Sequence, residues 1–348
     1  MKTPEASIII LNWNGLNHLQ ECLESLAKQS FKDFECILVD NGSTDGSLDF
    51  LASNHKWVKL VKLPNNLGFA KGNNIGLKHS NGRYIVTLNN DTVSDKHWLA
   101  ELVKIAKQHP EAGMVASRIC SYFNQDVIDS LGLKICLDGM SRGAFRGQKY
   151  STLRSIPQNV LLPSACAALY KKEMLDQTGF FDESFFAYCE DTDLGLRGRR
   201  LGWKAILARN AVVYHKYSMT GGSFSPFKIY LVERNHFWCT IKNFPTLLLL
   251  ILPITTFIRY LFQCLIAISG QGSGKDFKSS HSQKSCISAF LRGILHGIFH
   301  ARDKIHERFF SSSFWKISDD KMTKEILVHR LSFPELFDAR NNRNRDMT

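Results

Sequence analysis

Short apolar runs alternate with amphipathic stretches along the first two thirds of the chain. Leucines at helical spacing after the first run predict a helix, and similar patterns predict helices over residues 70–79 and 96–108. Strands that alternate with helices are typical of an α/β fold with a mainly parallel, doubly wound sheet covered on both faces. The predicted strands of the first half cover residues 7–11, 36–39, 58–63, 84–88 and 113–116.

The pattern is less regular in the stretch that follows. Residues 118–160 are rich in Gly, Ser and Arg, and we expect a loop or hairpin there, close to a functional site. A strand pattern returns at residues 165–170, and a helix over 191–201 and a strand over 205–214 follow. We therefore assign residues 1–240 to one α/β domain.

The composition changes after this domain. Residues 247–268 are strongly apolar but are interrupted by Pro253 and Arg259. A membrane-spanning helix needs about 20 apolar residues, so this segment is a borderline spanning candidate. Residues 286–310 have the pattern of an amphipathic helix with basic residues on its polar side. We assign residues 241–337 to a helical, membrane-associated region and residues 338–348 to a disordered tail.

The charge of the chain is concentrated in this C-terminal region. The formal net charge is +12, and residues 216–348 contain 19 basic and 10 acidic side chains. Because the surplus lies beside apolar helices, it favours a membrane surface over nucleic acid as the anionic partner. The alternative for the same region is a helical appendage packed on the α/β domain, or an oligomer interface.

The number and spacing of the cysteines indicate the redox environment of the protein. There are nine cysteines, an odd number without a Cys-x-x-Cys pair, and several of them lie inside apolar runs, as Cys36 does. We expect reduced, mostly buried cysteines in a cytosolic protein. The N-terminus leads directly into a strand pattern, so no signal peptide is predicted.

Polar side chains follow four of the predicted strands. A single Asp or Asn in such a place is most often a turn former or a helix cap. Ligands of doubly wound sheets bind at the carboxyl ends of the strands, so four polar strand ends together favour a ligand site. They are Asn12 with Asn14, Asp40 with Asn41, Asn65 with Asn66, and residues 89–91.

Two of these strand ends suit a nucleoside diphosphate. Residues 65–74 are rich in Asn and Gly, which permits close approach of a phosphate to the next helix, although a tight turn would need the same glycines. Asn89, Asn90 and Asp91 offer the oxygen ligands that Mg²⁺ or Mn²⁺ prefers. The alternative for Asp91 is a cap on the helix that follows.

An acidic cluster, Glu190, Asp191 and Asp193, begins a predicted helix. The helix dipole and a pair between Asp193 and Arg197 could account for all three carboxylates. The cluster also follows an aromatic run, and carboxylates held against rings and one another have raised pKa values, which suits a general base. His215 ends the next strand, either as a metal ligand or as an ordinary polar residue.

The order of these motifs resembles family 2 glycosyltransferases of the GT-A fold, in particular the rhamnosyltransferase-like branch. The resemblance covers roughly residues 5–240. Each motif is modest, but their order is specific. The segments that carry it are residues 7–15, 39–47, 66–76, 88–92 and 179–197, followed by His215, Arg234 and Asn235.

The resemblance implies a role for each candidate residue. Asp191 would be the general base, with Glu190 and Asp193 orienting it or the acceptor. Asp91 would bind Mg²⁺ or Mn²⁺ with His215, although Asn89 replaces the first Asp of the family's Asp-x-Asp element. Asp40 would hold the pyrimidine base. The residues lining the nucleotide-sugar would be Asn12, Asn14, Asp40, Asn41, Gly72, Asn73, Asn89, Asn90 and Asp91.

The implied activity is a single inverting displacement. It would move rhamnose or a similar sugar from a UDP- or dTDP-sugar to a glycan or polyprenyl-linked acceptor during synthesis of cell-surface polysaccharide. The implied location is the cytoplasmic face of the inner membrane. The alternative is a non-catalytic membrane scaffold that binds sugar nucleotides. A dinucleotide-dependent oxidoreductase is excluded, because no Gly-x-Gly-x-x-Gly follows the first strand.

Overall fold

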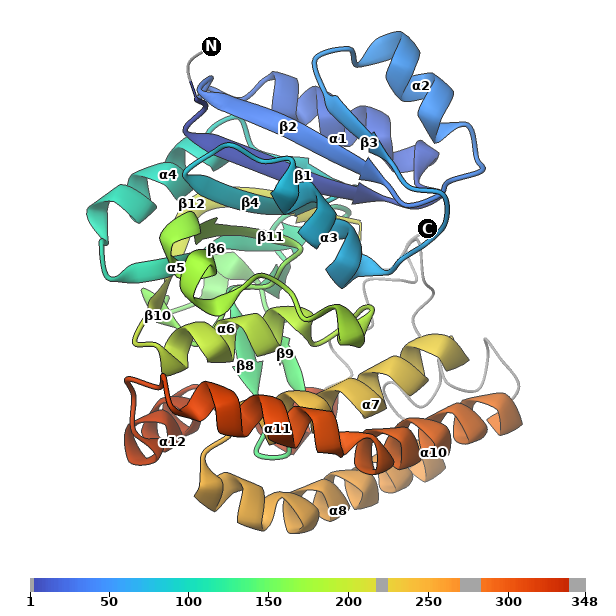
Figure 1. Ribbon diagram of the computed structural model, residues 1–348, viewed down its shortest axis with the longest axis vertical. Coiled ribbons are helices and arrows are strands. Elements are labelled where there is room, and N and C mark those ends of the chain that lie inside the picture. The colour runs from blue at the N-terminus through green and yellow to red at the C-terminus, as the bar shows by residue number, and fades with distance from the viewer. Residues whose placement is uncertain (1–2, 217–224, 270–282, 338–348) are drawn as a thin grey trace.

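The computed structural model describes residues 3–216, 225–269 and 283–337. Figure 1 shows an α/β unit at one end and a layer of C-terminal helices at the other. The main sheet has the strand order β10-β12-β6-β11-β4-β1-β2-β3, with β5 and β7 attached to its side. Its strands are β1 (Ala6–Asn12), β2 (Phe34–Asp40), β3 (Lys59–Lys62), β4 (Tyr84–Asn89), β5 (Thr92–Ser94), β6 (Ala112–Ser121), β7 (Ile128–Ser130), β10 (Asn159–Val160), β11 (Ala167–Lys171) and β12 (Lys204–His215).

The sheet is mainly parallel along this path, as predicted, but it is not uniform. β3, β2, β1 and β4 are parallel neighbours, and so are β6 and β12. β11 lies between these two groups and is antiparallel to both β4 and β6. The apolar pattern at residues 165–170 located this strand but carried no information about its direction, because a strand buried on both faces has the same composition either way.

Both faces of the sheet are buried, which explains the continuous apolar runs. Along β1, Ile8 and Ile10 belong to one core and Ile9 to the other. Helices α1 (Leu16–Ala27) and α4 (Trp98–Gln108) contribute to the first core, and the second receives α3 (Phe69–Lys78), α5 (Lys172–Thr178) and α6 (Glu190–Arg200). A further short helix, α2 (Ser47–Asn54), follows β2.

The irregular stretch at residues 118–160 forms short strands and a hairpin. β6 continues through Ser121, β7 pairs with it, and β8 (Leu133–Ile135) and β9 (Ser141–Gly143) pair with each other. The prediction of a hairpin near the site is confirmed, as the next section shows. Its turn contains Asp138, which is fully buried against the C-terminal helices.

The C-terminal helices pack under α6 through a third core, which includes Phe185, Trp238 and Phe244. The single amphipathic helix predicted over residues 286–310 is divided at His300 into two, and the predicted boundary at residue 240 falls inside α7. The predicted tail, residues 338–348, lies outside the described residues. The helices are α7 (Pro226–Asn243), α8 (Thr246–Ser269), α10 (Gln283–Phe299), α11 (Ala301–Ser312), α12 (Asp319–Val328) and α13 (Phe333–Phe337).

Helix α8 has two faces of opposite character. One face is buried and carries Arg259, whose side chain is fully enclosed and bonds to Asp138 and to both oxygens of Glu233, at 3.1 and 2.9 Å. The other face is exposed and apolar. Of the described helices, α8 is long and apolar enough to cross a membrane. None of the nine cysteines forms a disulfide, and most are buried, as expected.

Candidate active site

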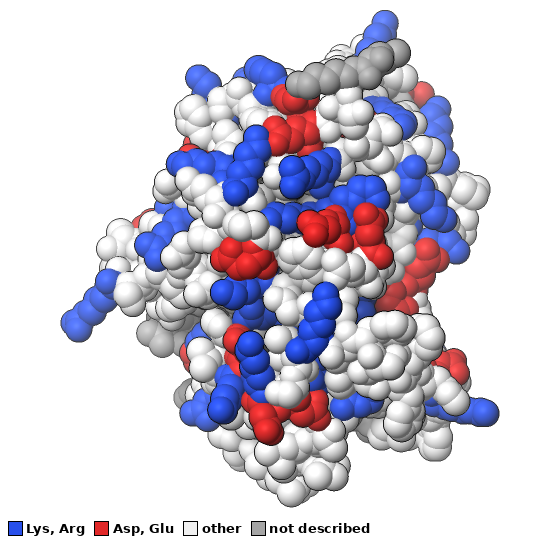
Figure 2. All heavy atoms as spheres, turned by 60° about the vertical axis from the view of Figure 1, so that its left-hand side comes forward, with Lys and Arg blue, Asp and Glu red and all other residues white. Residues whose placement is uncertain are grey.

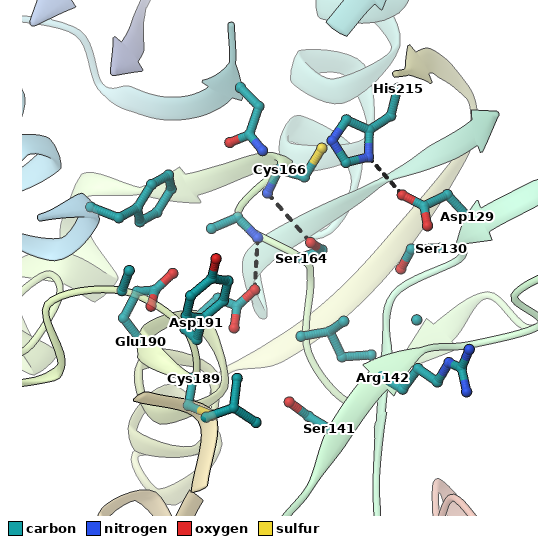
Figure 3. Close-up of a pocket in the computed structure, with 18 of the residues that line it drawn as sticks. Asp129, Ser130, Ser141, Arg142, Ser164, Cys166, Cys189, Glu190, Asp191 and His215 are labelled. Atoms are coloured by element: carbon teal, nitrogen blue, oxygen red, sulfur yellow. Dashed lines mark hydrogen bonds and ion pairs between the residues drawn. The ribbon is translucent and has the colours of Figure 1, made fainter. Parts of the chain in front are cut away.

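A cavity of about 490 Å³ opens where the carboxyl ends of β1 and β4 meet α6, β12, the β8–β9 hairpin and α7. Segments far apart in the sequence meet there, and their side chains point into the same space (Figure 3). Parallel strands end at one edge of a sheet, which is why the polar strand ends converge. Six of the predicted site residues line the cavity: Asn89, Asn90, Asp91, Glu190, Asp191 and His215.

Asp191 lies in the first turn of α6 and faces the cavity (Figure 3). Its carboxylate accepts hydrogen bonds from the backbone N–H groups of Ala165, at 3.1 Å, and Thr192, at 2.7 Å. Burial raises the pKa of Asp191, and these hydrogen bonds oppose the rise without cancelling it. The side chain is therefore fixed in place and more basic than an ordinary aspartate, as a general base requires.

Glu190 precedes this aspartate and is only 6% exposed. Glu190 lines the cavity, and its Oε2 atom is buried without a hydrogen-bond partner among the described residues. Burial, and then the neighbouring Asp191, raise the pKa of Glu190 well above the usual glutamate range. A buried polar atom without a partner is costly, so the ionised form of Glu190 is disfavoured at this place.

We expect Glu190→Gln to stabilise the fold, and increasingly so as the pH rises. The pKa of Glu190 is higher in the folded state than in the unfolded state. The protonated side chain is therefore tolerated at low pH, and the fold loses stability as the pH rises and the buried carboxyl group has to ionise. The amide has nearly the same shape and does not ionise. Urea unfolding at about pH 5 and about pH 9 should show a gain in stability that is larger at the higher pH, by at least about 1 kcal/mol. Parallel pH profiles for the two proteins would contradict this account.

The turn that leads into α6 has an unusual backbone. Phe186, Tyr188 and Cys189 have φ angles of 66°, 71° and 68°, in the left-handed region that non-glycine residues rarely adopt. Each such residue costs about 1–3 kcal/mol and persists only where the surroundings enforce it. This turn therefore needs external support to present Asp191 to the cavity.

Asn235 on α7 provides that support. Its fully buried amide donates hydrogen bonds to the carbonyl groups of Phe185, at 2.9 Å, and of Ala187 and Tyr188, both at 2.8 Å. The adjacent Arg234 donates to the Phe185 carbonyl as well, at 2.9 Å. The Arg–Asn pair of the sequence motif thus holds the turn that carries the acidic residues.

Asp91 and His215 form a second functional pair in the cavity. The Asp91 Oδ1 and His215 Nε2 atoms are 3.3 Å apart, and His215 Nδ1 donates to Asp129 Oδ2 at 2.7 Å (Figure 3). Burial disfavours the charged imidazole, but Cys166, Asp91 and Asp129 outweigh it and raise the pKa of His215 well above its usual value. In the absence of a cation, the pair is therefore held together by a proton.

This donor set fits a divalent cation. A carboxylate that fixes the Nδ1 proton of a histidine leaves Nε2 as the ligand atom, and a metal ion displaces the proton that Nε2 would otherwise carry. Within the described residues, no group of three or more His, Cys, Asp or Glu side chains is arranged to hold a metal. Asp91 and His215 would supply two ligands, and oxygen atoms of a bound diphosphate and water would supply the others.

The comparisons with known proteins agree with this geometry. Residues 7–179, about half of the chain, match the model of Glycosyl transferase family 2. The chain belongs to glycosyltransferase family 2.

Individual relatives of this family 2 member come from several bacteria. It is 29% identical over 232 residues to the O-antigen biosynthesis protein RfbC of Myxococcus xanthus, covering 62% of this chain and 17% of that protein. It is 25% identical to an N-acetylglucosaminyl-diphospho-decaprenol L-rhamnosyltransferase of Mycobacterium tuberculosis over 62% of this chain and 77% of the relative. The rhamnosyltransferase-like resemblance is thus confirmed. The chain spans less than two thirds of some relatives, such as 59% of GlyG from Streptococcus pneumoniae.

Solved structures confirm the GT-A type of fold. S. aureus TarS in complex with UDP-GlcNAc superposes with a TM-score of 0.54 at 20% identity, over 89% of this chain and 90% of that one. A mannosyltransferase of Pyrobaculum calidifontis in complex with GDP-Man and Mn²⁺ superposes with a TM-score of 0.51 at 17% identity, over 97% and 88% of the two chains.

The other predicted nucleotide ligands of this family 2 chain do not line the cavity. Asn12 donates to Asp40 at 3.1 Å and accepts from Asn90 at 2.8 Å, so it connects two strand ends. Asp40 is fully buried, and its second oxygen accepts from the Ser43 N–H at 3.0 Å. The predicted contact of Asp40 with the nucleotide base stays a prediction.

Two more of these residues organise loops. Asn14 accepts a hydrogen bond from the Thr44 N–H at 2.8 Å, and Asn41 donates to Asn66 at 2.8 Å and accepts from the Leu67 N–H at 2.9 Å. Both therefore hold the segments that follow β2 and β3 in place. Their predicted contact with the nucleotide stays a prediction.

Gly72 and Asn73 lie in α3, away from the cavity lining. A Cβ atom on Gly72 would come within 2.3 Å of Leu11, so the glycine allows α3 to lie close to β1. Asn73 is 1% exposed and donates to the Phe69 carbonyl at 2.9 Å. Both residues have a packing role. The alternative stated for residues 65–74, in which the glycines serve the backbone rather than a phosphate, anticipated this in part.

Asp193 does not line the cavity either. It is fully buried and contacts Arg197 at 2.8 Å, Lys242 at 3.0 Å and Asn243 at 2.8 Å. Burial opposes ionisation, but the two cations outweigh it and lower the pKa of Asp193. The residue fastens α6 to α7, and any influence on Asp191 would act through the position of α6.

Several residues of the cavity had no signal in the sequence. Asp129 holds His215, although it lies in the irregular stretch where neither strand nor motif was evident. Arg142 and Arg146 line the cavity from the same stretch, and Ser164 and Lys228 line it from outside that stretch. A lone Asp or Arg in a Gly- and Ser-rich segment is indistinguishable from a surface residue until the topology places it.

Proposed function

We propose that this protein is an inverting glycosyltransferase that transfers rhamnose or a similar sugar from a UDP- or dTDP-sugar to a glycan or polyprenyl-linked acceptor during cell-surface polysaccharide synthesis. The observation that carries the proposal is one cavity that holds both a fixed, partly buried Asp191 and the Asp91–His215 pair. The names of the O-antigen and rhamnosyltransferase relatives support the pathway and the sugar. A non-catalytic scaffold would have no need for a strained turn that presents a basic carboxylate.

The proposed reaction is a single displacement at the anomeric carbon. Asp191 removes the proton of the acceptor hydroxyl as that oxygen forms the new glycosidic bond, and the bond to the nucleoside diphosphate breaks with its electron pair on the phosphate oxygen. Asp91 and His215 would hold Mg²⁺ or Mn²⁺, which when bound offsets the negative charge of the diphosphate. Glu190, with its unpartnered oxygen, would hydrogen-bond a hydroxyl of the donor or acceptor sugar.

A thermal-shift screen of nucleotide sugars with Mn²⁺ tests the donor. A ligand that binds the folded state raises the melting temperature by an amount that grows with the ratio of its concentration to its Kd, and at equal concentration we expect a UDP- or dTDP-sugar to raise it more than the purine nucleotide sugars. Asp91→Ala should abolish the Mn²⁺-dependent part of the shift. Asp95→Asn, a carboxylate outside the cavity lining, is the matched control. A shift of equal size in Asp91→Ala would remove the proposed metal role.

We further infer that the protein docks on the cytoplasmic face of a membrane through its C-terminal helices. The exposed face of α8 presents Leu250, Ile254, Phe257 and Leu265, which are 62–73% exposed, at helical spacing. In Figure 2 the lower end of the molecule, where α8 lies in Figure 1, has few charged side chains. An apolar face of this extent needs a partner, and a lipid surface fits its length.

The buried face of α8 favours attachment along the surface over a span. Arg259 lies in the middle of the helix and pairs with Asp138 and Glu233 inside the protein. A helix crossing the bilayer would place these three charged groups at the depth of the hydrocarbon, where they are costly. We therefore propose peripheral docking, with α8 parallel to the membrane.

Flotation with vesicles tests this attachment. We expect the full chain to float with vesicles of phosphatidylglycerol and phosphatidylcholine, and Phe257→Gln combined with Leu261→Gln to reduce the bound fraction by about tenfold. Trp57→Gln replaces an exposed aromatic residue between α2 and β3, in the α/β unit, and should leave flotation unchanged. If the double variant instead changed only the oligomeric state, the apolar face would be an oligomer interface and the membrane proposal would fail.

A further inference from the structure

A buried group of charged side chains joins α11 to the segment that leads into α6. Lys304 on α11 is 3% exposed, and its ammonium group lies 2.7 Å from Asp182 Oδ2 and 2.6 Å from Glu307 Oε1. Lys242 on α7 contacts the same Asp182 oxygen at 2.6 Å and Glu307 Oε2 at 3.0 Å. In Figure 1 α11 lies below α6, and in the sequence it lies far beyond the segment that matches the family model.

The contacts of this group pair three carboxylates with three cations. Burial disfavours the ionised form of Asp182, but Lys242 and Lys304 outweigh it and lower the pKa of that carboxyl. Without Lys304, the contacting groups would carry one more negative than positive charge, which is costly in a buried place. The carboxylates are Asp182, Asp193 and Glu307, and the cations are Lys242, Lys304 and Arg197.

Asp182 also fixes the start of the short 3₁₀ helix η2 (Glu183–Phe185). Its Oδ1 atom accepts hydrogen bonds from the Ser184 N–H at 3.0 Å and the Ser184 hydroxyl at 2.7 Å, while Oδ2 holds the two lysines. The ammonium groups of Lys242 and Lys304 lie 5.5 and 5.7 Å from the centroid of the buried Phe185 ring. One carboxylate therefore caps η2 and fastens it to α7 and α11.

The same segment continues directly into the left-handed turn and Asp191. α7 holds the Phe185 carbonyl, and the Ala70 N–H at the start of α3 donates to the Phe186 carbonyl at 3.0 Å. These contacts act on carbonyl groups of the turn, whereas Asp182 acts on the N–H groups that precede it. A strained backbone persists only while its surroundings enforce it, so the loss of one support should displace the turn.

We propose that Lys304 is a positioning residue for the proposed base: through Asp182 it holds the turn that presents Asp191 to the cavity. The inference rests on the proposed function, in which Asp191 is the base. Lys304 does not line the cavity, so it acts only through the position of the turn. A displaced base weakens an interaction made in the transition state, which lowers kcat and leaves the KM for the donor nearly unchanged.

Hydrogen exchange of the full chain, followed by mass spectrometry, tests this contact without requiring transfer. Lys304→Met should raise the exchange rate of the amides of residues 183–187 by about tenfold, because Asp182 then caps η2 less firmly. Lys304→Arg, which keeps the charge, should restore part of the protection. Lys321→Met removes an exposed lysine on α12 and should change nothing. If Lys304→Met raised exchange in α11 alone, Lys304 would only fasten its own helix and the proposal would be wrong.

A charge-balanced variant covers the case in which Lys304→Met does not fold. Lys304→Met combined with Glu307→Gln removes one charge of each sign from the group, and Glu307 is partly exposed. Because Asp182 still loses one of its two lysines, we expect the same rise in exchange over residues 183–187 as in the single variant. Wild-type exchange in the double variant would show that the contact does not hold the turn.

Turnover of dTDP-rhamnose with Mn²⁺, measured as release of dTDP, gives the kinetic readout. Lys304→Met should lower kcat by about tenfold or more, since a base misplaced by about 1 Å can cost about 100-fold in rate. The acid limb of the pH–rate profile should move to higher pH, because a displaced Asp191 loses the Ala165 hydrogen bond that opposes the rise of its pKa. Lys304→Arg should recover part of both effects.

Two kinetic results separate this inference from the proposed function. If Lys304→Met lowered stability in urea but kept the kcat and pH profile of the wild type, Lys304 would be merely structural and the proposal would be overturned. If the wild-type chain released no dTDP at all, the proposed transfer of rhamnose from this donor would fail, and the exchange of residues 183–187 would alone decide whether Lys304 holds the turn.

Discussion

Asp191→Asn should lower the rate of transfer by about 10²–10⁴-fold, the usual contribution of a positioned general base, while donor affinity changes little. The amide keeps the shape of the side chain and can still accept a hydrogen bond from the Ala165 N–H, but it cannot accept the proton of the attacking hydroxyl. Single-turnover assays with a saturating donor, together with calorimetry of donor binding, separate the two effects.

The same residue predicts a pH dependence. Burial raises the pKa of Asp191, so on acidification the wild-type rate should begin to fall at a higher pH than that at which an exposed aspartate is protonated. Asp176→Asn, an exposed carboxylate on α5, is the matched control and should keep the wild-type profile. A variant at position 191 with near-normal turnover, or a rate independent of pH over this range, would assign the base elsewhere in the cavity.

Arg259→Met should lower the free energy of unfolding by about 3–5 kcal/mol, because Asp138 and Glu233 would remain buried without a counter-charge. The loss arises from the uncompensated carboxylates rather than from the missing side chain. Adding Asp138→Asn and Glu233→Gln to the same chain should therefore recover much of it. Urea unfolding followed by circular dichroism measures each step.

The control for this series is Arg302→Met, which makes the same change at an exposed position of α11. It should alter stability by less than about 0.5 kcal/mol. If Arg259→Met lowered the free energy of unfolding as little as the control does, the buried ionic contacts would not stabilise the attachment of α8.

Periodicity located most of the sheet and the helices that cover it, because buried strands and amphipathic helices have characteristic apolar spacing. The runs at Ile8 and Ile37 were unambiguous for this reason. The direction of β11 and the short strands at residues 118–160 were not predictable, since both depend on contacts between distant segments. His300 divides a helix whose apolar spacing continues on both sides, so the sequence pattern could not mark the break.

The site was predictable where chemistry coincided with strand ends or helix starts. Asp91, Asp191 and His215 were identified in this way, and they meet in one cavity. The pattern could not distinguish a side chain that enters the cavity from one that points into the protein, because neighbours on a helix turn by about 100° per residue. Asp191 and Asp193 are two residues apart and therefore face different surroundings, a cavity and an ion cluster.

The contact between Arg259 and the hairpin turn has one more consequence. The hairpin that forms a wall of the catalytic cavity and the helix whose far side is apolar are joined by a buried, charged contact, which fixes the position of one relative to the other. With α8 resting on a bilayer, the height of Asp191 above the lipid would be constant. Asp191 would then select acceptors by the distance of their hydroxyl group from the membrane surface. Only a hydroxyl that its lipid anchor holds at that distance would reach the base.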